Sequence, residues 1–431
     1  MERTCYTNEL GKHIDKTVVI SGWVHDIRLI GGINFILLRD KEGIIQVTVL
    51  KKSAPEKILD ILQKTHQEDV LSVKGKVVKS KIAKIGIEII PSEIEVMSRS
   101  EVPLPLDPRQ VTPANLDTKL NNRFLDLRTH ESRSIFRIQS QITKSFREFM
   151  ISHGYMEIQP PCIISSASEG GAELFSFPYF EKHAFLAQSP QLYKQMCALA
   201  FEKVFSIMPV FRAEKFDQPT HLNEIRQMDI EQAFADDKVV MKVLEEVFIH
   251  ILEDVKKECK EELEILGQKL EIPKLPLKRI TYKNAVELLK KNGEKIEYGE
   301  DFTKTQEKML VDLVKDDVFF VVEWPAEIKA FYAMPSEKDP GAVNAFDFIY
   351  KGLELASGTQ RVHIPGILEK KIKEKGLNPE NFKFYIDTFR YGSAMHAGWS
   401  IGLERITMKI TGRNNIREAC MFPRDRSRIT P

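Results

Sequence analysis

The sequence lacks the features that mark membrane and exported proteins. No stretch approaches the roughly 18 to 20 uninterrupted apolar residues that a helix needs to span a bilayer. The N-terminal run from Met1 to Cys5 has no apolar core of an export signal. The five cysteines are odd in number, lie tens of residues apart and form no Cys-x-x-Cys pair for zinc or redox chemistry. We therefore expect a cytoplasmic protein with no membrane partner.

An excess of charge of one sign is also lacking. The chain has 63 Lys and Arg against 62 Asp and Glu, so its net charge is +1 and any polyanion must be held by local clusters. Hydrophobic residues make up 42% and charged residues 29%, with only 22 Gly and 21 Pro, which is typical of folded globular proteins. A length of 431 residues favours two or three domains. A peptide hormone or a lone binding module is therefore excluded.

The first hundred residues alternate in β-branched side chains, as in Val18-Val19-Ile20, and glycines mark their turns. They predict five strands with a helix after the third. Five strands and one helix in this order are typical of an OB-fold β-barrel, which we assign to residues 1–101. The predicted strands are residues 17–28, 33–39, 43–50, 69–78 and 86–97, with the helix at 55–64.

Lysines gather around the fourth predicted strand and the turn after it. Such a cluster can contact the phosphates of a nucleic acid, or it can protect a solvated sheet edge, and the cluster alone favours neither. Its members are Lys74, Lys76, Lys79, Lys81 and Lys84.

Prolines at positions 103, 105 and 108 cannot continue a helix or sheet, and they predict a hinge or linker over residues 102–131. An amphipathic helix at about 132–152 then opens a second domain, residues 132–431. Helical periodicity with few motifs predicts an inserted helical segment at about 236–340 within that domain.

Three segments of the second domain carry distinctive chemistry. Residues 211–231 predict a hairpin with Arg212 and His221 around a polar loop, which suits a polyanion such as ATP with a metal, or equally a surface hairpin with ion pairs. Residues 398–405 place glycines where a strand meets a helix and end on Arg405, which suits a phosphate or a base. Together with residues 154–161, and in this position after an OB-like domain, these segments resemble motifs 1, 2 and 3 of class II aminoacyl-tRNA synthetases.

Further segments narrow the resemblance. Residues 168–175 and 185–195 resemble the amino-acid pocket of the aspartyl, asparaginyl and lysyl subgroup, and residues 346–361 and 422–426 resemble the aspartyl enzymes. Over nearly its whole length the chain is similar to aspartyl-tRNA synthetases of the compact archaeal and eukaryotic type. This implies an α+β fold in which an N-terminal OB-fold β-barrel precedes a class II catalytic domain built on an antiparallel sheet. It also implies a homodimer.

The resemblance implies a ligase that activates L-aspartate with ATP and transfers it to the terminal ribose of tRNA(Asp). The α-carboxylate of aspartate attacks the α-phosphate itself, so the protein mainly positions reactants and neutralises charge. Arg212 would hold the α-phosphate and Arg405 the γ-phosphate end, with Lys194 as the third catalytic cation. Glu354 and Ser357 match positions that bind Mg²⁺ through oxygen. The ATP-binding residues so implied are Arg212, Glu214, His221, Leu222, Glu354, Gly402 and Arg405.

The same resemblance implies an aspartate pocket. Arg361 would hold the β-carboxylate with two hydrogen bonds and Lys194 would add positive charge, which favours aspartate over neutral asparagine. Glu169 and Asp229 would receive the α-ammonium group. Two positions depart from the family pattern, since a usual glycine is replaced by Ser400 and an adenine-stacking aromatic by Ile225. The aspartate-binding set is Glu169, Ser189, Gln191, Lys194, Asp229, Ser357 and Arg361.

For the OB-fold domain the resemblance implies binding of the tRNA anticodon, with unpaired bases stacked on the strands. The candidates are His25, Arg28, Phe35, Gln46 and Lys84. Some relatives that charge both tRNA(Asp) and tRNA(Asn) carry histidine at the position of His25, where strict ones carry tryptophan. We therefore hypothesise a non-discriminating enzyme; the alternative is a strand histidine without a role in tRNA choice.

Other functions compete with this interpretation. An asparaginyl-tRNA synthetase would share the fold and the reaction, but the Ser-Gly-Thr-Gln-Arg run at 357–361 argues against its neutral-amide pocket. A synthetase-like paralogue that makes asparagine typically lacks the anticodon module, and one that only binds RNA commonly loses the ATP-binding arginines. Because this chain has the module and both arginines, we favour the aspartyl enzyme.

Overall fold

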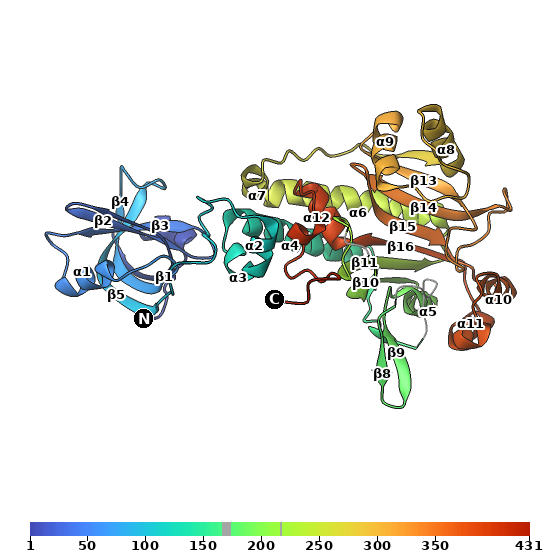
Figure 1. Cartoon of the computed structure of the whole chain (residues 1–431), viewed down its shortest axis with the longest axis horizontal. Helices are drawn as coiled ribbons and strands as arrows, with labels where there is room; N and C mark the ends of the chain where they lie inside the picture. Colours follow the sequence, from blue (N-terminus) through green and yellow to red (C-terminus); the bar gives the residue numbers. More distant parts are fainter. Residues whose placement is uncertain (166–173, 216–217) are drawn as a thin grey trace. The chain divides into compact units, whose positions relative to one another are not determined.

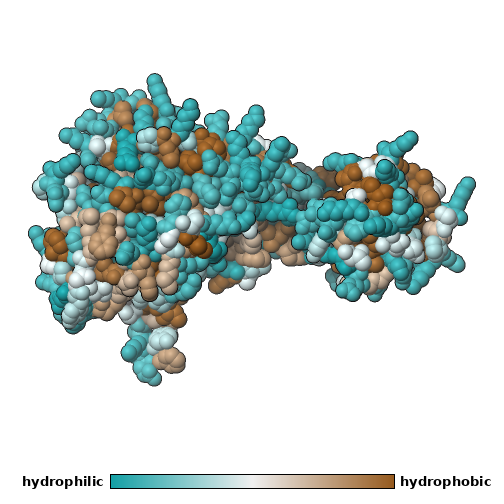
Figure 2. All heavy atoms as spheres, turned by 180° about the vertical axis from the view of Figure 1, so that it is seen from behind, coloured by the Kyte–Doolittle hydropathy of each residue, from teal (hydrophilic) through white to brown (hydrophobic). Residues whose placement is uncertain are grey.

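The computed structural model describes residues 1–165, 174–215 and 218–431. These residues form two compact units, Met1–Thr129 and His130–Pro431 (Figure 1). Within the described ranges, no helix combines the length and the apolar character needed to cross a bilayer. On the face shown in Figure 2, polar residues dominate and apolar residues form separate patches.

The first unit is built around a closed five-stranded barrel in the order β1-β2-β3-β5-β4, which confirms the predicted OB-fold. Side chains alternate along each strand, so that Val18, Ile20 and Val24 of β1 are buried in the barrel core. The strand ends lie within a residue or two of the sequence prediction. The elements are η1 (Thr7–His13), β1 (Thr17–Ile30), β2 (Ile33–Arg39), β3 (Ile44–Leu50), α1 (Glu56–Gln63), β4 (Val70–Lys79) and β5 (Ile87–Ser98).

Most of the segment predicted as a hinge, residues 102–131, belongs to the first unit. Arg109 forms an ion pair with Asp26 of β1 at 2.8 Å, and Arg128 forms one with Glu68 at 2.7 Å. These pairs hold the segment on the barrel, a contact that the prolines in its sequence do not reveal. Its helices are α2 (Leu116–Asn121) and α3 (Arg123–Asp126).

The second unit is built around an eight-stranded sheet in the order β12-β13-β14-β15-β16-β11-β10-β6. Neighbouring strands are antiparallel except at the two edges, where β12 pairs with β13 and β6 with β10 in parallel. This sheet confirms the predicted α+β fold. The strands are β6 (Met156–Glu157), β10 (Lys203–Phe211), β11 (Glu224–Ala233), β12 (Lys278–Thr281), β13 (Val318–Pro325), β14 (Ala342–Tyr350), β15 (Leu353–Gln360) and β16 (His396–Gly402).

Two long helices, α4 (His130–Ser152) and α6 (Asp237–Glu258), cover one face of this sheet. Phe146 of α4 meets Trp399 of β16 edge to face at 6.2 Å, and the indole nitrogen of Trp399 donates to the carbonyl of Val240 in α6 at 2.9 Å. Because side chains alternate along a strand, Ser400 points to the opposite face. That face is not covered by these two helices.

The segment at 236–340 differs from the sequence prediction, because it is not purely helical. It contributes β12 and β13, which extend the central sheet. β13 is a nearly continuous apolar run that is buried on both faces, as suits an interior strand, and Phe319 and Val321 pack with Tyr282 in one core. The helices after α6 are α7 (Lys260–Ile265), α8 (Tyr282–Lys291) and α9 (Lys304–Val314).

A small sheet in the order β7-β9-β8 stands beside the main one, and its β8–β9 hairpin projects from the second unit (Figure 1). Its strands are β7 (Ile163–Ile164), β8 (Ser176–Tyr179) and β9 (Lys182–Leu186). The remaining elements are α5 (Gln191–Phe201), α10 (Pro365–Glu374), η2 (Pro379–Phe382), α11 (Lys383–Arg390), α12 (Leu403–Ile410) and η3 (Ile416–Ala419).

Gly398 in β16 permits the close packing of β16 on β11. A Cβ atom at this position would lie 2.2 Å from the carbonyl oxygen of Ile230 and 2.3 Å from a carboxylate oxygen of Glu231. We expect Gly398→Ala to destabilise the second unit by about 2–3 kcal/mol, because an added methyl group in a packed interior forces backbone shifts. Urea unfolding followed by tryptophan fluorescence measures the effect.

The matched control is Gly366→Ala in α10, where a Cβ would meet nothing within 4 Å. This change should be neutral or stabilising, because alanine favours helix over glycine by about 0.5–1 kcal/mol. Equal unfolding midpoints for the two variants would contradict the packing role of Gly398.

Candidate active site

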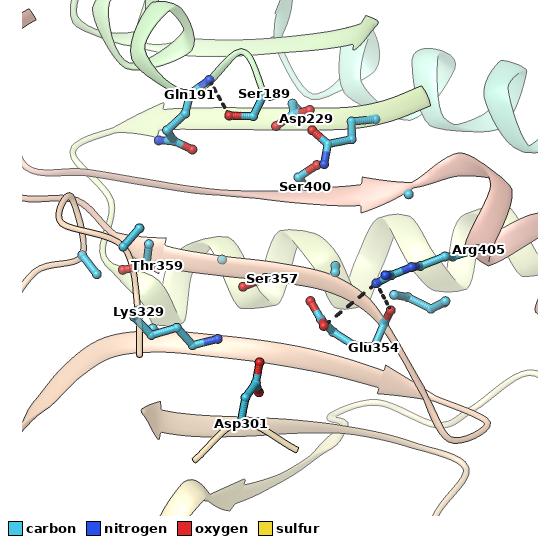
Figure 3. A pocket seen from close by; sticks show the side chains of 18 of the residues that line it. Ser189, Gln191, Asp229, Asp301, Lys329, Glu354, Ser357, Thr359, Ser400 and Arg405 are labelled. Atoms are coloured by element: carbon cyan, nitrogen blue, oxygen red, sulfur yellow. Dashed lines mark hydrogen bonds and ion pairs between the residues drawn. The ribbon is translucent and has the colours of Figure 1, made fainter. Parts of the chain in front are cut away.

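A cavity of about 470 Å³ opens on the face of the central sheet opposite α4 and α6 (Figure 3). Strands β11, β15 and β16 form its floor. Along β11 every second residue, Ile225, Gln227 and Asp229, lines the cavity, as the alternation of side chains in a strand requires. β16 contributes Ser400 and Gly402 in the same way.

Most of the residues predicted to bind ATP or aspartate meet in this cavity. Glu214 and Leu222 instead line a smaller adjoining pocket. Glu169 lies outside the described residues. The predicted residues around the main cavity are Ser189, Gln191, Lys194, Arg212, His221, Asp229, Glu354, Ser357, Arg361, Gly402 and Arg405.

Four buried charged groups lie at one end of the cavity, and three of them, Lys194, Asp229 and Arg361, line it. The ammonium group of Lys194 lies 2.8 Å from Asp229 and 3.6 Å from Glu231. Arg361 donates from Nε and Nη2 to the two carboxylate oxygens of Glu231, at 2.9 and 3.1 Å. Glu231 therefore occupies one edge of the Arg361 guanidinium. The edge formed by Nη1 and Nη2 is left for a second carboxylate, so the two hydrogen bonds to a substrate carboxylate stay a prediction.

One carboxylate oxygen of Asp229 is not used by Lys194. Oδ1 accepts from Lys194, whereas Oδ2 is buried and meets no hydrogen-bond geometry among the described residues. Burial raises the pKa of Asp229, and Lys194 and the hydroxyl of Ser400 oppose that rise. Asp229 is the register neighbour of Ser400, which is in turn the neighbour of Ser357 on β15. A row of polar side chains therefore crosses the floor, with Asp347 of β14 after Ser357.

The other end of the cavity is rich in cations. Arg405, in the first turn of α12, donates to the backbone carbonyl of Glu354 at 3.0 Å and lies 3.9 Å from its carboxylate (Figure 3). Burial opposes the ionisation of Glu354, yet the surrounding cations outweigh burial and lower its pKa. These cations are Arg405, Lys304, Lys329 and Arg212.

His221 lies at the same end. Burial first, and then the nearby charges of Arg405, Lys304 and Arg212, lower the pKa of His221 to about 4. Its ring is therefore neutral at pH 7 and can donate one hydrogen bond from one nitrogen. The nearest acidic group is Glu214, 3.8 Å from Nε2.

The loop that carries His221 is held by Asn223, which sequence reasoning missed. The amide of Asn223 donates to the backbone carbonyls of Arg212 at 2.7 Å and Glu214 at 3.1 Å, and the backbone of Arg212 donates to that of Asn223 at 2.9 Å. The two arms of the hairpin are thereby joined beyond the last strand pair.

Oxygen donors at the cation-rich end suit a hard metal ion such as Mg²⁺. Glu354 and Ser357 were predicted as ligands, and Asp347 lies across the strand pair from Ser357. Lys329 pairs with both oxygens of Asp347, at 2.8 and 2.7 Å, and burial raises the pKa of Asp347 to about 6 despite this pairing. Among the described residues no three or more His, Cys, Asp and Glu form a metal cluster.

In the first unit, the predicted anticodon residues fall largely on one sheet. Arg28 of β1 faces Phe35 of β2, and Gln46 lies on the adjoining β3. Gln46 is held by Glu88 at 2.8 Å. His25 lies at the register shift of β1, a β-bulge that turns its side chain, with Nδ1 3.4 Å from a guanidinium nitrogen of Arg39. Lys84 is exposed in the turn between β4 and β5.

Comparison with known proteins agrees with this arrangement. The family described as tRNA synthetases class II (D, K and N) matches residues 115–426, and the family of OB-fold nucleic acid binding domains matches residues 18–97. The chain belongs to the class II tRNA synthetases of the D, K and N group. Class II synthetases use ATP as a substrate.

Three known proteins are similar to this chain over nearly its whole length. The aspartate–tRNA(Asp/Asn) ligase of Methanocaldococcus jannaschii is 45% identical over 431 residues, which covers 100% of this chain and 98% of that protein. The aspartate–tRNA(Asp) ligase of Pyrococcus furiosus is 44% identical over 438 residues and 100% of both chains. The asparaginyl-tRNA synthetase of Pyrococcus horikoshii with asparaginyl-adenylate superposes with a TM-score of 0.96 at 32% identity, over 100% of both chains.

Several residues of the synthetase site were missed by sequence reasoning. Glu231 was seen only as part of an acidic run, and nothing indicated its pairing with Arg361, 130 positions away. Lys304 and Lys329 come from the segment in which no motif was recognised, although both line the cavity. Asp347 lies in a segment that carries the family resemblance. Its position opposite Ser357 on the neighbouring strand, however, is visible only in the structure.

The pKa of His221 tests the electrostatics of the ligand-free synthetase. We expect histidine side-chain NMR to give a pKa of about 4, so that the ring stays neutral above that pH. Arg405→Gln should raise this pKa part of the way to its ordinary value, because burial remains the larger cause. Lys182→Gln, on the distant β8–β9 hairpin, is the control and should change nothing. An unchanged pKa in Arg405→Gln would refute the coupling of the two side chains.

Proposed function

We propose that this chain is an aspartate–tRNA ligase. An α-carboxylate oxygen of L-aspartate attacks the α-phosphorus of ATP, a new oxygen–phosphorus bond forms, and the bond to pyrophosphate breaks. A terminal ribose hydroxyl of tRNA(Asp) then attacks the aspartyl carbonyl carbon and AMP leaves. Neither step needs a nucleophile from the protein, whose side chains position the reactants and neutralise charge.

The observation that carries the proposal is the charge balance of the buried end. Lys194 and Arg361 supply two positive charges, and Asp229 and Glu231 supply two negative charges. The α-carboxylate, which both amino acids share, is directed toward ATP and lies outside this sum. At the buried end aspartate then adds an ammonium group beside Asp229 and a β-carboxylate beside the two cations, so the sum over these groups stays at zero. Asparagine adds the ammonium group without a β-carboxylate and leaves one positive charge unbalanced, which a buried site penalises.

The cation-rich end supports ATP as the second substrate. Arg212 is proposed to hold the α-phosphate, and His221 and Arg405 the γ-phosphate end. Asp347, Glu354 and Ser357 are proposed to hold Mg²⁺, which when bound neutralises part of the phosphate charge. The nucleoside is proposed to lie at this end of the cavity, beside the small adjoining pocket that Glu214 and Leu222 line.

The tRNA range of the enzyme rests on His25. The relative named for both tRNA(Asp) and tRNA(Asn) and the relative named for tRNA(Asp) alone are almost equally similar to this chain, at 45% and 44% identity. Overall similarity therefore does not decide between them. We propose that His25, with Arg28, Phe35, Gln46 and Lys84, contacts the anticodon and permits both tRNAs.

A homodimer is proposed from the outer surface of α4. A groove of about 510 Å³ runs along this helix and includes the exposed side chains of Ile151 and Met421 beside Leu403. Apolar surface of this kind is typical of subunit interfaces. A cytoplasmic location follows from the proposed tRNA substrate.

Amino-acid-dependent exchange of pyrophosphate with ATP tests the activation step. We expect exchange with aspartate, and a kcat/KM for asparagine lower by at least about 100-fold, because one unbalanced buried charge costs about 3 kcal/mol or more. Exchange with asparagine and not with aspartate would replace the proposal by an asparaginyl-tRNA synthetase.

A variant at Arg361 links that result to the cavity. Arg361→Leu would strip Glu231 of its partner and endanger the fold, so the test uses Arg361→Lys, which keeps the charge and loses the planar fork. We expect a loss of about 100-fold in kcat/KM for aspartate, equivalent to about 2.7 kcal/mol, with the KM for ATP almost unchanged. Arg390→Lys, on the exposed surface of α11, is the matched control.

Aspartylation of purified tRNA(Asp) and tRNA(Asn) transcripts tests the tRNA range. We expect similar kcat/KM values for the two tRNAs, and we expect His25→Trp to lower the value for tRNA(Asn) by about tenfold or more, equivalent to about 1.4 kcal/mol. His183→Trp, on the β8–β9 hairpin, should change neither. A strong preference of the unaltered enzyme for tRNA(Asp) would end the hypothesis of a non-discriminating enzyme.

A further inference from the structure

A chain of buried hydrogen bonds leads from the amino-acid end of the cavity into the protein. It starts at Gln191, whose amide nitrogen lies 2.8 Å from Oε1 of Gln195, one turn further along α5. The amide nitrogen of Gln195 lies 2.8 Å from Nε2 of His396 in β16, and Nδ1 of His396 lies 2.9 Å from the backbone carbonyl of Ala394. Tyr385 of α11 joins at Gln195 Oε1, at 2.7 Å.

The donor and the acceptor of each hydrogen bond in this series follow from its inner end, the backbone carbonyl of Ala394. The carbonyl of Ala394 can only accept, so Nδ1 of His396 carries the hydrogen. In the neutral imidazole Nε2 is then an acceptor, and the amide nitrogen of Gln195 must donate to it. Oε1 of Gln195 consequently accepts both from Tyr385 and from Gln191. The amide nitrogen of Gln191 is thereby used, and its Oε1 is left as an acceptor on the cavity side.

The surroundings of His396 favour the neutral ring that this chain needs. The ring has no solvent exposure, and Phe389 stacks on it with centroids 5.6 Å apart. Burial lowers the pKa of His396, and Glu231 opposes this effect. Both Gln195 and Tyr385 are also fully buried, so no water competes for the amide of Gln195.

We propose that His396 and Gln195 are positioning residues that hold the carbonyl oxygen of Gln191 toward the α-ammonium group of the substrate. The ammonium group then has two acceptors, Oε1 of Gln191 and Oδ2 of Asp229. A freely rotating Gln191 amide would present its NH₂ group half of the time, and that group repels a cation. The inference rests on the proposed function, because it assigns the amino acid to this end of the cavity.

Three variants test the series of hydrogen bonds by pyrophosphate exchange. Gln195→Met and His396→Leu each remove a link and keep the volume roughly constant. We expect each to raise the KM for aspartate by about tenfold, as the loss of one hydrogen bond to a charged group implies, with the KM for ATP unchanged. His396→Gln keeps an acceptor near the position of Nε2 and should restore most of the affinity.

Succinate separates positioning from a general packing defect. This diacid has carboxylates like aspartate but no ammonium group, so it does not use the carbonyl oxygen of Gln191. We expect its inhibition constant to be nearly the same in the unaltered enzyme, Gln195→Met and His396→Leu. An equal loss of affinity for succinate and aspartate would show that the variants merely disturb the pocket, and it would overturn the proposal.

A double-mutant cycle gives the decisive readout. If Gln195 acts through Gln191, then Gln195→Met should have almost no further effect on the KM for aspartate once Gln191→Ala is present. Additive effects of the two changes would overturn the proposal. Tyr385→Phe is the matched control, because it removes a donor to Gln195 and leaves the path from His396 to Gln191 intact.

The same measurements keep this inference apart from the proposed function. The chain orients an acceptor for the α-ammonium group, which aspartate and asparagine share. If the unaltered enzyme activates asparagine in place of aspartate, the proposed function fails and the cycle is run with asparagine, where the same pattern is expected. If it activates neither amino acid, both proposals fall together.

Discussion

The buried group of Lys194, Asp229, Glu231 and Arg361 is the constraint on which the rest of the site depends. Two charges of each sign have left water, and pairs of this kind seldom add net stability. They persist only when each charge meets its partner with good geometry. The partners come from α5, from β11 and from Arg361, the residue that follows β15, so these elements must be placed to bring the four side chains together. Gly398 serves the same end, because the side chain of Glu231 occupies the space beside it.

The two ends of the cavity solve different electrostatic problems on one sheet. At the amino-acid end, the buried positive and negative charges of the protein sum to zero. A ligand whose ammonium group and side chain carry opposite charges leaves this sum unchanged. At the other end, Arg212, Arg405, Lys304 and Lys329 line the cavity together with Asp301, Glu307 and Glu354. Burial, and after it the charges of the nearby cations, keeps His221 neutral. Arginines and lysines in this number suit the phosphates of a polyanion. The alternation of side chains in β11, β15 and β16 keeps both ends on the face opposite α4 and α6.

The sequence could predict the features that depend on residues close together in the chain. The barrel strands and α4 were predicted because alternation and helical periodicity are local signals. The positions of β12 and β13 in the main sheet were not predicted, because a buried apolar run does not indicate which strands pair with it. Most of the predicted site residues line one cavity, and they were named from a resemblance between motifs. The pairing of Arg361 with Glu231 and of Lys329 with Asp347 was out of reach, because no local pattern connects positions so far apart.

The fold alone does not choose between aspartate and asparagine. An asparaginyl-tRNA synthetase superposes on the whole chain with a TM-score of 0.96, so the backbone is common to enzymes with different substrates. The two amino acids have nearly the same shape and differ by one charge. A site can distinguish them through the sum of its fixed charges and through its hydrogen-bond donors and acceptors, because an amide NH₂ donates where a carboxylate oxygen only accepts. Here that sum is set by four side chains that are already paired with one another, and the substrate must enter without upsetting their balance. The carbonyl oxygen of a neutral amide, such as that of Gln191, can then help to place the ammonium group without changing this sum.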